Sequence, residues 1–453
     1  MSFLGEDYLL DSATARELYQ EIERLPIIDA HNHADPEEIV KNQPWKDIWQ
    51  VEGATDHYVW EMMRKRGVPE EKITGGAPNN VKWEALAAIF PWLAGNPTYE
   101  WVHLDLRRQF QIDEIISSST ARVIWDKCRS SLAQPRMLPQ SLLQTMQIEI
   151  MCTTDDPTTS LPFHEQAARE IHPTRILPTW RPDKAMNIDT PAWRPLLEQL
   201  EAETGEPVSM LQGFLRSLQA THDYFAKLGC VASDHGVYEP YSHFVSEKIA
   251  EGIHQKAWRG KKLSGQEVMD YKAFMLNSFG EMNVGSGWTT QLHIGPVRDY
   301  RDSLKQTLGP DTGGDISSQS IDVAGHLHRF VNEFDQRLEI VLYCVDPTHL
   351  PTLSTIARAF PNVSLGSAWW WNDSPYGMET QLKYVATVDL LANHAGMVTD
   401  SRKLLSFGSR TEMFRRTLCN VIGEMVQRRQ IPEEPALDLV TSLAYQRPKE
   451  LFF

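Results

Sequence analysis

The sequence contains few cysteines, and their spacing excludes two classes of site. Five cysteines lie far apart in a chain of 453 residues, and no two form a CxxC pair: Cys128, Cys152, Cys230, Cys344 and Cys419. A disulfide framework or a thiolate zinc site needs cysteines at short, matched spacings. We therefore expect five reduced thiols that are buried as small apolar side chains.

Long apolar runs and an excess of positive charge are also missing. No run reaches the roughly 20 apolar residues of a membrane-spanning helix, and the start of the chain lacks the basic and apolar segments of a signal peptide. Acidic residues outnumber basic ones by 60 to 44, which gives a net charge of -16. Nucleic-acid binding requires clustered lysine and arginine. These absences predict a cytoplasmic protein that binds neither membranes nor nucleic acids.

The sequence does contain a series of short apolar runs that end in polar or ionisable residues. Hydrophobic residues make up 42% of the chain and charged residues 23%, which suits a globular protein with a substantial core. Runs of this kind are typical of buried parallel strands whose carboxyl ends open onto a site. They predict eight strands, at residues 25–30, 148–153, 175–179, 230–233, 290–294, 339–344, 363–367 and 396–399.

The segments between these strands have helical spacing of apolar residues, as in residues 349–360. Eight strands that alternate with helices predict an α/β protein with a (β/α)8 TIM-like barrel. An open doubly wound sheet is the alternative fold, but the sequence lacks its glycine-rich phosphate-binding motif.

The predicted strands are unevenly spaced along the chain. The stretch between the first two predicted strands is too long for a single crossover helix. Residues 36–147 are therefore interpreted as a helical insertion over the barrel mouth, with a helix at 58–66. Residues 1–35 and 148–453 then form the barrel domain. A second helical insertion is expected after the fourth strand, between residues 238 and 285.

The first predicted strand ends in Asp29-Ala30-His31-Asn32-His33. Alternate residues of a strand point the same way, so His31 and His33 could bind one cation through ring nitrogens at about 2.0–2.1 Å. Asp400 ends the eighth predicted strand, which neighbours the first in a closed barrel. We therefore expect one divalent metal ion on His31, His33 and Asp400. Zinc is the first choice for this ligand set, with manganese or another divalent ion as the alternative.

A histidine pair after the first strand and an aspartate after the eighth resemble the amidohydrolase superfamily. Within it, longer motifs resemble the uronate isomerase (glucuronate isomerase) family over nearly the whole chain. These motifs are Asp56-His57-Tyr58, Cys152-Thr153-Thr154-Asp155-Asp156-Pro157, Pro178-Thr179-Trp180-Arg181-Pro182-Asp183, Ser233-Asp234-His235-Gly236, Gln291-Leu292-His293-Ile294-Gly295, Ala368-Trp369-Trp370-Trp371-Asn372-Asp373 and Thr399-Asp400-Ser401-Arg402.

The resemblance implies an aldose–ketose isomerase for hexuronates. It would convert D-glucuronate to D-fructuronate, D-galacturonate to D-tagaturonate, or both, by proton transfer between C2 and C1 through an enediol. Asp400 would act as the base as well as a metal ligand, and the metal would hold the substrate carboxylate and the C5 hydroxyl. His57 and Tyr58 would bind the substrate near C1 and C2 and exchange protons with its hydroxyls.

Four further residues receive roles from the same resemblance. Arg181 and Arg402 would bind the carboxylate or the enediolate, since a guanidinium forms a bidentate pair with an anion, and Arg402 counts among the catalytic residues. His293 is expected to be a hydrogen-bond partner of the substrate, with a role as a further metal ligand as the alternative. Trp370 would stack on a sugar face, with core packing as the alternative.

Two other functions stay open at this point. A hydrolase of the same superfamily, acting on a sugar-acid lactone or amide, often bridges two metals with a lysine after the fourth strand, where this chain has Ser233-Asp234-His235-Gly236. There, Asp234 and His235 are expected to support the site or the fold. A non-catalytic sugar-acid binding protein would have lost the ligand or proton-transfer residues, which are all present. The expected partner is a small hexuronate, and a homo-oligomer is left open.

The chain departs from the family pattern in three segments, which are expected to border the barrel mouth. It carries Arg298-Asp299-Tyr300-Arg301 where the family has Arg-Asn-Asn-Asn, and it differs again at Gly313-Gly314-Asp315 and Arg410-Thr411-Glu412. These departures leave the preferred uronate open.

Overall fold

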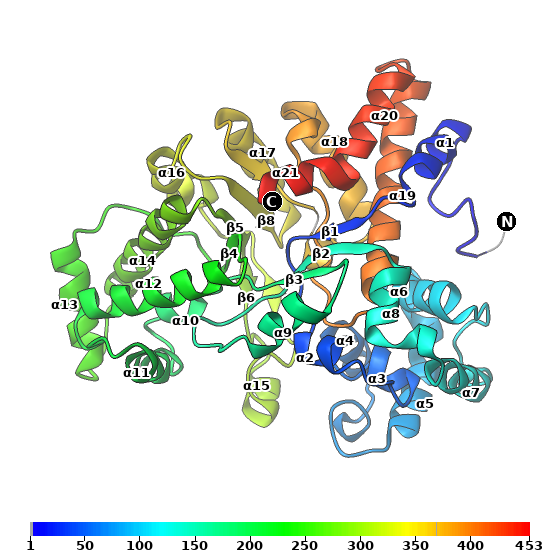
Figure 1. Ribbon diagram of the computed structural model, residues 1–453, viewed down its shortest axis with the longest axis horizontal. Helices are drawn as coiled ribbons and strands as arrows, with labels where there is room; N and C mark the ends of the chain where they lie inside the picture. The colour runs from blue at the N-terminus through cyan, green and yellow to red at the C-terminus, as the bar shows by residue number, and fades with distance from the viewer. Residues whose placement is uncertain (1–2, 368) are drawn as a thin grey trace.

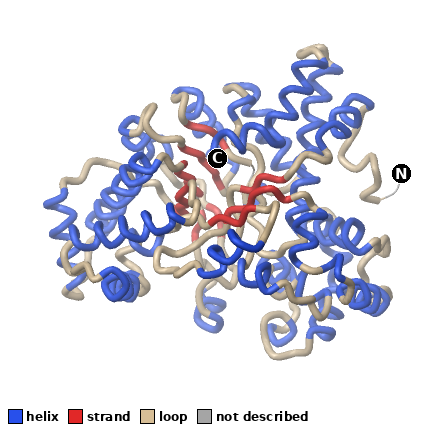
Figure 2. Tube along the Cα trace, in the orientation of Figure 1, coloured by secondary structure: helices blue, strands red, loops and turns tan. Residues whose placement is uncertain are grey.

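The computed structural model describes residues 3–367 and 369–453 and has short parallel strands at its centre with helices around them (Figures 1 and 2). One parallel sheet has the order β1-β2-β3, and a second has the order β4-β5-β8-β9. A short antiparallel pair, β6 with β7, lies outside both. The strands are β1 (Ile27–Asp29), β2 (Ile148–Cys152), β3 (Arg175–Leu177), β4 (Ala232–Val237), β5 (Thr289–Ile294), β6 (Pro296–Val297), β7 (Ile316–Ser317), β8 (Ile340–Cys344) and β9 (Val363–Leu365). The predicted α/β class is confirmed.

Each of the first seven predicted strands overlaps an observed parallel strand. The largest shift concerns the fourth, predicted at 230–233 and observed as β4 (Ala232–Val237). Asp234 and His235 therefore lie within the strand rather than after it. The pair β6 and β7 was not predicted, because two-residue strands leave no periodic pattern in the sequence.

The prediction of a regular strand at residues 396–399 is wrong. Gly396 has a φ of +83° and Asp400 a φ of +49°, and both values interrupt extended backbone. In addition, the N–H of Thr399 donates to Oδ1 of Asp29 at 2.9 Å and not to a main-chain carbonyl.

This irregular segment nevertheless lies between β9 and β1. The N–H of Ser367 donates to the carbonyl of Gly396 at 3.1 Å, and the N–H of Asp400 donates to the carbonyl of His31 at 3.1 Å. Trp180 makes a similar connection between the two sheets, since it forms isolated parallel bridges to Asp155 and Ser233. The two parallel sheets are thus linked at both sides by single residues or irregular backbone.

Between β1 and β2 the chain forms helices with a hydrophobic core of their own. Trp83, Leu86, Phe90 and Val102 belong to that core, which extends to strand residues such as Ile148. In Figure 1 these helices gather beside β1–β3, on the side opposite α11–α13. The helices are α2 (Pro36–Lys41), α3 (Ile48–Glu52), α4 (His57–Lys65), α5 (Asn79–Ile89), α6 (Pro97–Asp105), α7 (Ala121–Leu132) and α8 (Pro139–Thr145).

Local sequence explains where several of them begin. Asp47 and Asp56 accept hydrogen bonds from the first backbone N–H groups of α3 and α4, and Asn96 does so for α6. The helix predicted at 58–66 is confirmed as α4.

The remaining helices cover the strands elsewhere. They are α1 (Ala13–Ile22), α9 (Pro162–Glu170), α10 (Asp183–Met186), α11 (Trp193–Thr204), α12 (Leu211–Lys227), α13 (Glu247–Trp258), α14 (Gly265–Ser286), α15 (Asp302–Leu308), α16 (Val323–Glu333), α17 (Leu350–Ala359), α18 (Pro375–Val388), α19 (Ser406–Gln427), α20 (Glu433–Thr441) and α21 (Arg447–Phe452). The helix predicted at 349–360 is confirmed as α17. None of the helices in the described residues has the length and apolar character to span a membrane.

Gly366, directly after β9, is packed so closely that we expect a larger side chain there to lower the stability of the fold. A Cβ atom there would lie 1.9 Å from Cε1 of the buried Tyr343. Gly366→Ala is therefore expected to destabilise the fold by about 1–3 kcal/mol through overpacking. Gly252→Ala in α13 is the control, because its Cβ meets nothing within 4 Å and alanine favours a helix by about 1 kcal/mol. Thermal unfolding at one scan rate measures both, and a Gly366→Ala midpoint at or above the parent value contradicts the packing account.

Candidate active site

Two histidines and an aspartate meet where β1 ends. Nε2 of His31 and Nε2 of His33 each lie 3.2 Å from Oδ1 of Asp400. The segment before Asp400 is held against β1 because the carboxylate of Asp29 accepts hydrogen bonds from the N–H and hydroxyl of Thr399, at 2.9 and 2.7 Å. The structure therefore brings together the three residues that the sequence analysis assigned to a metal.

These three side chains have the chemistry of a divalent metal site. Their ligand atoms lie within 4.8 Å of one another. Burial lowers the pKa of His33 to about 3, so its imidazole is neutral at pH 7. Burial acts to raise the pKa of Asp400, but hydrogen bonds from His31 and His33 hold it well below its ordinary value. A neutral imidazole and an ionised carboxylate are the forms that bind metals.

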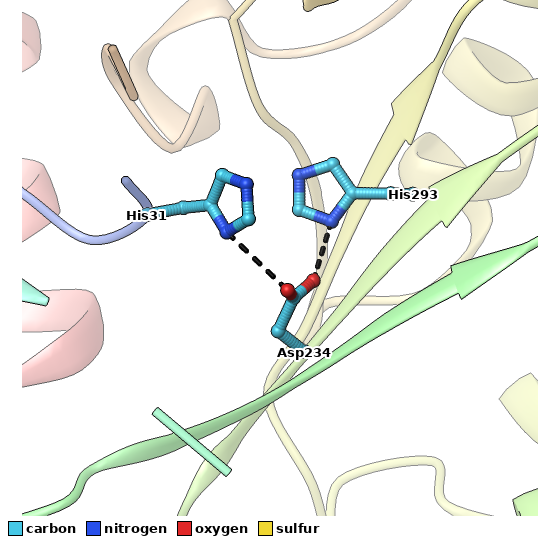
Figure 3. A group of neighbouring side chains, drawn as sticks. All are labelled: His31, Asp234 and His293. Carbon is cyan, nitrogen blue, oxygen red and sulfur yellow. Dashed lines mark hydrogen bonds and ion pairs between the residues drawn. The ribbon is translucent and has the colours of Figure 1, made fainter. Parts of the chain in front are cut away.

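A second group shares His31 with the first (Figure 3). Nδ1 of His31 lies 3.4 Å from Oδ2 of Asp234, and Nδ1 of His293 lies 2.6 Å from Oδ1 of the same carboxylate. Arg181 adds a third partner, with Nη1 at 3.0 Å from Oδ2 of Asp234. These ligand atoms also lie close enough to hold an ion, but the positive charge of Arg181 is already paired with Asp234, whereas the ion-pair partners described for Asp400 are histidines. We therefore interpret the second group as support for the first.

Asp234 influences which ring nitrogen of His31 carries a proton. A carboxylate at Nδ1 favours a proton on that nitrogen, so Nε2, which here donates to Oδ1 of Asp400, is the atom that would bind a metal after losing its proton. Burial acts to lower the pKa of His31, but the charges of Asp234 and Asp400 raise it overall. Burial acts to raise the pKa of Asp234, but Arg181, His31 and His293 together hold it well below its ordinary value.

The other oxygen of Asp400 faces two aromatic side chains. Nε1 of Trp369 donates to Oδ2 at 3.1 Å, and the hydroxyl of Tyr58 lies 3.5 Å from the same atom. Trp369 received no role from the sequence, although it belongs to the tryptophan run after the seventh predicted strand. Trp370, which it selected, is 3% exposed and has its ring 5.9 Å from that of His57.

His57 and Tyr58 form the first turn of α4. Oδ1 of Asp56 accepts the N–H of Tyr58 at 2.9 Å, which starts the helix there, and the two rings stack with centroids 4.5 Å apart. Burial and the charge of Arg402 lower the pKa of His57 to about 4. Burial and the charge of Asp400 raise the pKa of Tyr58 well above its ordinary value. At pH 7 both side chains are neutral and can donate or accept a proton.

Three arginines line an open cavity of about 450 Å³ beside His33: Arg181, Arg298 and Arg402. Arg181 is anchored by Asp183 at 2.8 Å as well as by Asp234. Arg298, which the sequence analysis did not select, lies with its guanidinium carbon 4.5 Å from the ring centroid of Trp370. The lining also contains Lys184 and four carboxylates, those of Asp155, Asp156, Asp183 and Asp311, so it carries charges of both signs. Its guanidinium groups suit the anionic group of a small ligand.

The predicted substrate-binding residues do not all reach this cavity. Arg181 and Arg402 line it, whereas His293 and Trp370 are buried, at 1% and 3% exposure. The roles of all the predicted site residues toward substrate and metal stay predictions.

The charge of Arg402 generates a prediction for His57. Because Arg402 lowers the pKa of His57, Arg402→Met is expected to raise it from about 4 toward the ordinary histidine value. NMR of ¹⁵N-labelled histidine, assigned with His57→Gln, measures the titration. Arg428→Met, an exposed arginine at the end of α19, is the control and leaves the titration unchanged. A His57 pKa that stays at the parent value or falls in Arg402→Met contradicts this reading of the site.

Comparison with known proteins agrees with the geometry. The family model for glucuronate isomerase matches residues 1–452. A uronate isomerase of Thermotoga neapolitana is 58% identical over 451 residues and aligns over 100% of both chains. The crystal structure of uronate isomerase from Thermotoga maritima has a TM-score of 0.99 at 58% identity, over 100% of both chains. That of glucuronate isomerase from Caulobacter crescentus has a TM-score of 0.95 at 26% identity, over 99% of this chain and 97% of the other.

These matches confirm the resemblance drawn from the sequence motifs, and they extend over the full length of the chain. The chain is an isomerase that belongs to the glucuronate isomerase family.

Proposed function

We propose that this chain interconverts hexuronates and their 2-keto isomers, D-glucuronate with D-fructuronate, D-galacturonate with D-tagaturonate, or both. The observation that carries the proposal is the buried carboxylate of Asp400, with His31 and His33 at one oxygen and Tyr58 and Trp369 at the other. The names of the relatives as uronate isomerases support the same reaction.

The fold we propose around this site is a closed (β/α)8 barrel formed by residues 1–35 and 148–453. Support comes from the contacts of Trp180 between β3 and β4 and from those of Gly396 and Asp400 between β9 and β1. In this arrangement residues 36–147 pack over the barrel mouth and bring α4 to the site, while α13 belongs to a second insertion after β4. Carboxyl ends of parallel strands are where barrel enzymes hold their catalytic groups.

His31, His33 and Asp400 would hold one divalent ion, with zinc as the first choice and manganese or another ion as the alternative. Such an ion supplies positive charge for the substrate carboxylate and the C5 hydroxyl. Arg181 and Arg402, which line the cavity, would bind the anionic groups of the substrate. Trp370 would be a stacking surface for the sugar and His293 a hydrogen-bond partner of the substrate.

The proton transfer requires a base near C2 and donors at the two oxygens. Ionised Asp400 would take the C2 proton while O1 is protonated, which gives the enediol. The same carboxylate would return the proton to C1 while the O2 hydroxyl loses its own, and C2 becomes the carbonyl. His57 and Tyr58 are neutral at pH 7 and lie together beside Asp400, so they would serve as the donor and acceptor at O1 and O2.

An assay in deuterated water tests the proposed reaction. The purified protein is mixed separately with D-glucuronate and D-galacturonate, with added zinc or manganese, and ketose formation is followed by NMR. Ketose is expected from at least one substrate, and deuterium at C1 or C2 reports exchange of the transferred proton with solvent. Absence of ketose from both uronates, together with hydrolysis of a uronolactone, would instead establish the hydrolase alternative.

Removing a proposed ligand is expected to remove the metal and the activity together. For Asp400→Asn and His33→Asn we expect metal affinity to fall at least about 100-fold, since changes even to residues around a metal ligand cost 10–100-fold. Elemental analysis of dialysed protein measures the metal content. His243→Asn is the matched control, because His243 is an exposed histidine paired with Asp270. Full metal content in Asp400→Asn and His33→Asn would show that the ion is held elsewhere.

A further inference from the structure

A buried lysine stands one residue beyond Arg402 and has no role in the chemistry above. The ammonium of Lys403 contacts the carboxylate of Glu52 and lies 3.4 Å from Oδ2 of Asp56 and 3.8 Å from Oδ2 of Asp105. All four side chains are at most 4% exposed. A lysine is almost never this deeply buried unless it is paired.

The three carboxylates come from three different helices of the segment between β1 and β2. Glu52 is the last residue of α3, Asp56 caps α4, and Asp105 is the last residue of α6. Lys403 belongs to the irregular segment that carries Asp400 and Arg402. One ammonium group therefore joins helices far apart in sequence to the part of the chain that supplies the central carboxylate.

Asp56 places this contact one side chain away from the proposed proton-transfer pair. Its Oδ1 accepts the N–H of Tyr58 at 2.9 Å, while its Oδ2 faces Lys403. A second contact joins the same two parts of the chain, because the hydroxyl of Thr55 donates to the carbonyl of Arg402 at 3.3 Å.

We propose that Lys403 is a positioning residue for the isomerisation, because it holds Asp56, and through it the His57–Tyr58 turn, in register with the Asp400–Arg402 segment. The proposal rests on the proposed function, because the position of His57 and Tyr58 relative to Asp400 affects the reaction only if these residues move its protons. Displacement of a catalytic group by 1 Å can lower a rate about 100-fold, so a fixed register has a direct effect on turnover.

The energetics of the cluster agree with a role in geometry rather than in stability alone. Oε1 of Glu52, Oδ2 of Asp56 and Oδ2 of Asp105 have no hydrogen-bond partner among the residues described. Lys403 therefore acts on Asp56 and Asp105 as an ion-pair partner, across 3.4 and 3.8 Å. Burial raises the pKa of Glu52 to about 8 and that of Asp105 to about 6, while Lys403 lowers the pKa of each. Replacing a buried ion pair by apolar side chains is often neutral or stabilising. Packing alone therefore gives no reason for four ionisable groups at this place.

Substitutions at both ends of the Lys403–Asp56 contact test the proposal. Lys403→Met removes the charge and keeps most of the stem, whereas Lys403→Arg keeps the charge. Asp56→Asn retains an oxygen to cap α4 but loses the charge that faces Lys403. We expect kcat on the accepted uronate to fall about 10- to 100-fold in Lys403→Met and in Asp56→Asn, and to recover substantially in Lys403→Arg.

Coupling between the two sites separates positioning from general destabilisation. Because both substitutions break one contact, the double variant is expected to be no slower than the slower single variant. Arg415→Met is the matched control: this buried arginine donates to the carbonyls of Glu23, Leu25 and Pro26, before β1. It is expected to lower the unfolding temperature, leave kcat near the parent value, and combine additively with Asp56→Asn.

Two results would overturn the proposal: a kcat within twofold of the parent in folded Lys403→Met, or losses that multiply in the double variant. If Lys403→Met does not fold, a parent-like kcat in Asp56→Asn overturns it. If the parent has no isomerase activity, the proposed function fails and the positioning role is read from the ¹⁵N ring signals of His57. These signals are expected to shift in Lys403→Met and Asp56→Asn but not in Arg415→Met, and unshifted signals would refute it.

Discussion

The site depends on one ionised carboxylate that is held inside the protein. A buried carboxylate is costly unless hydrogen bonds or cations surround it, and Asp400 has donors on both oxygens: two histidines on one side, Trp369 and Tyr58 on the other. This constraint explains why four separate parts of the chain converge there. It also explains the backbone, because Asp400 adopts a left-handed conformation that directs its side chain inward.

Charged residues farther from Asp400 hold the neighbours of this carboxylate in place. Asp234 fixes the ring of His31 and is in turn held by Arg181, which reaches the cavity. On the opposite side, Asp56 begins the helix that carries His57 and Tyr58 and faces Lys403. Arg181 and Tyr58 are thus connected to Asp400 by buried polar contacts, which is the pre-organisation that electrostatic catalysis requires.

Sequence reasoning predicted the elements that leave a local pattern. Apolar runs located the first seven strands, and the histidine pair with Asp400 located a cluster that the structure brings together. Residues 396–399 were predicted as a strand because their apolar pattern resembles one, whereas φ values and the Asp29–Thr399 contact, which the pattern does not encode, prevent it. Trp369 and Arg298 stand in motifs that the sequence displays, but neither they nor Lys403 received a role, because their significance lies in contacts with residues 31 to 351 positions away.

The central claim is that Asp400, His31 and His33 form the centre on which substrate and metal converge. Anomalous diffraction from crystals of the zinc-loaded protein, collected at the zinc absorption edge, tests it most directly. We expect one strong peak within about 2.0–2.2 Å of Nε2 of His31, Nε2 of His33 and an oxygen of Asp400. A peak among His31, Asp234 and His293 instead, or two peaks that share His31, would contradict it.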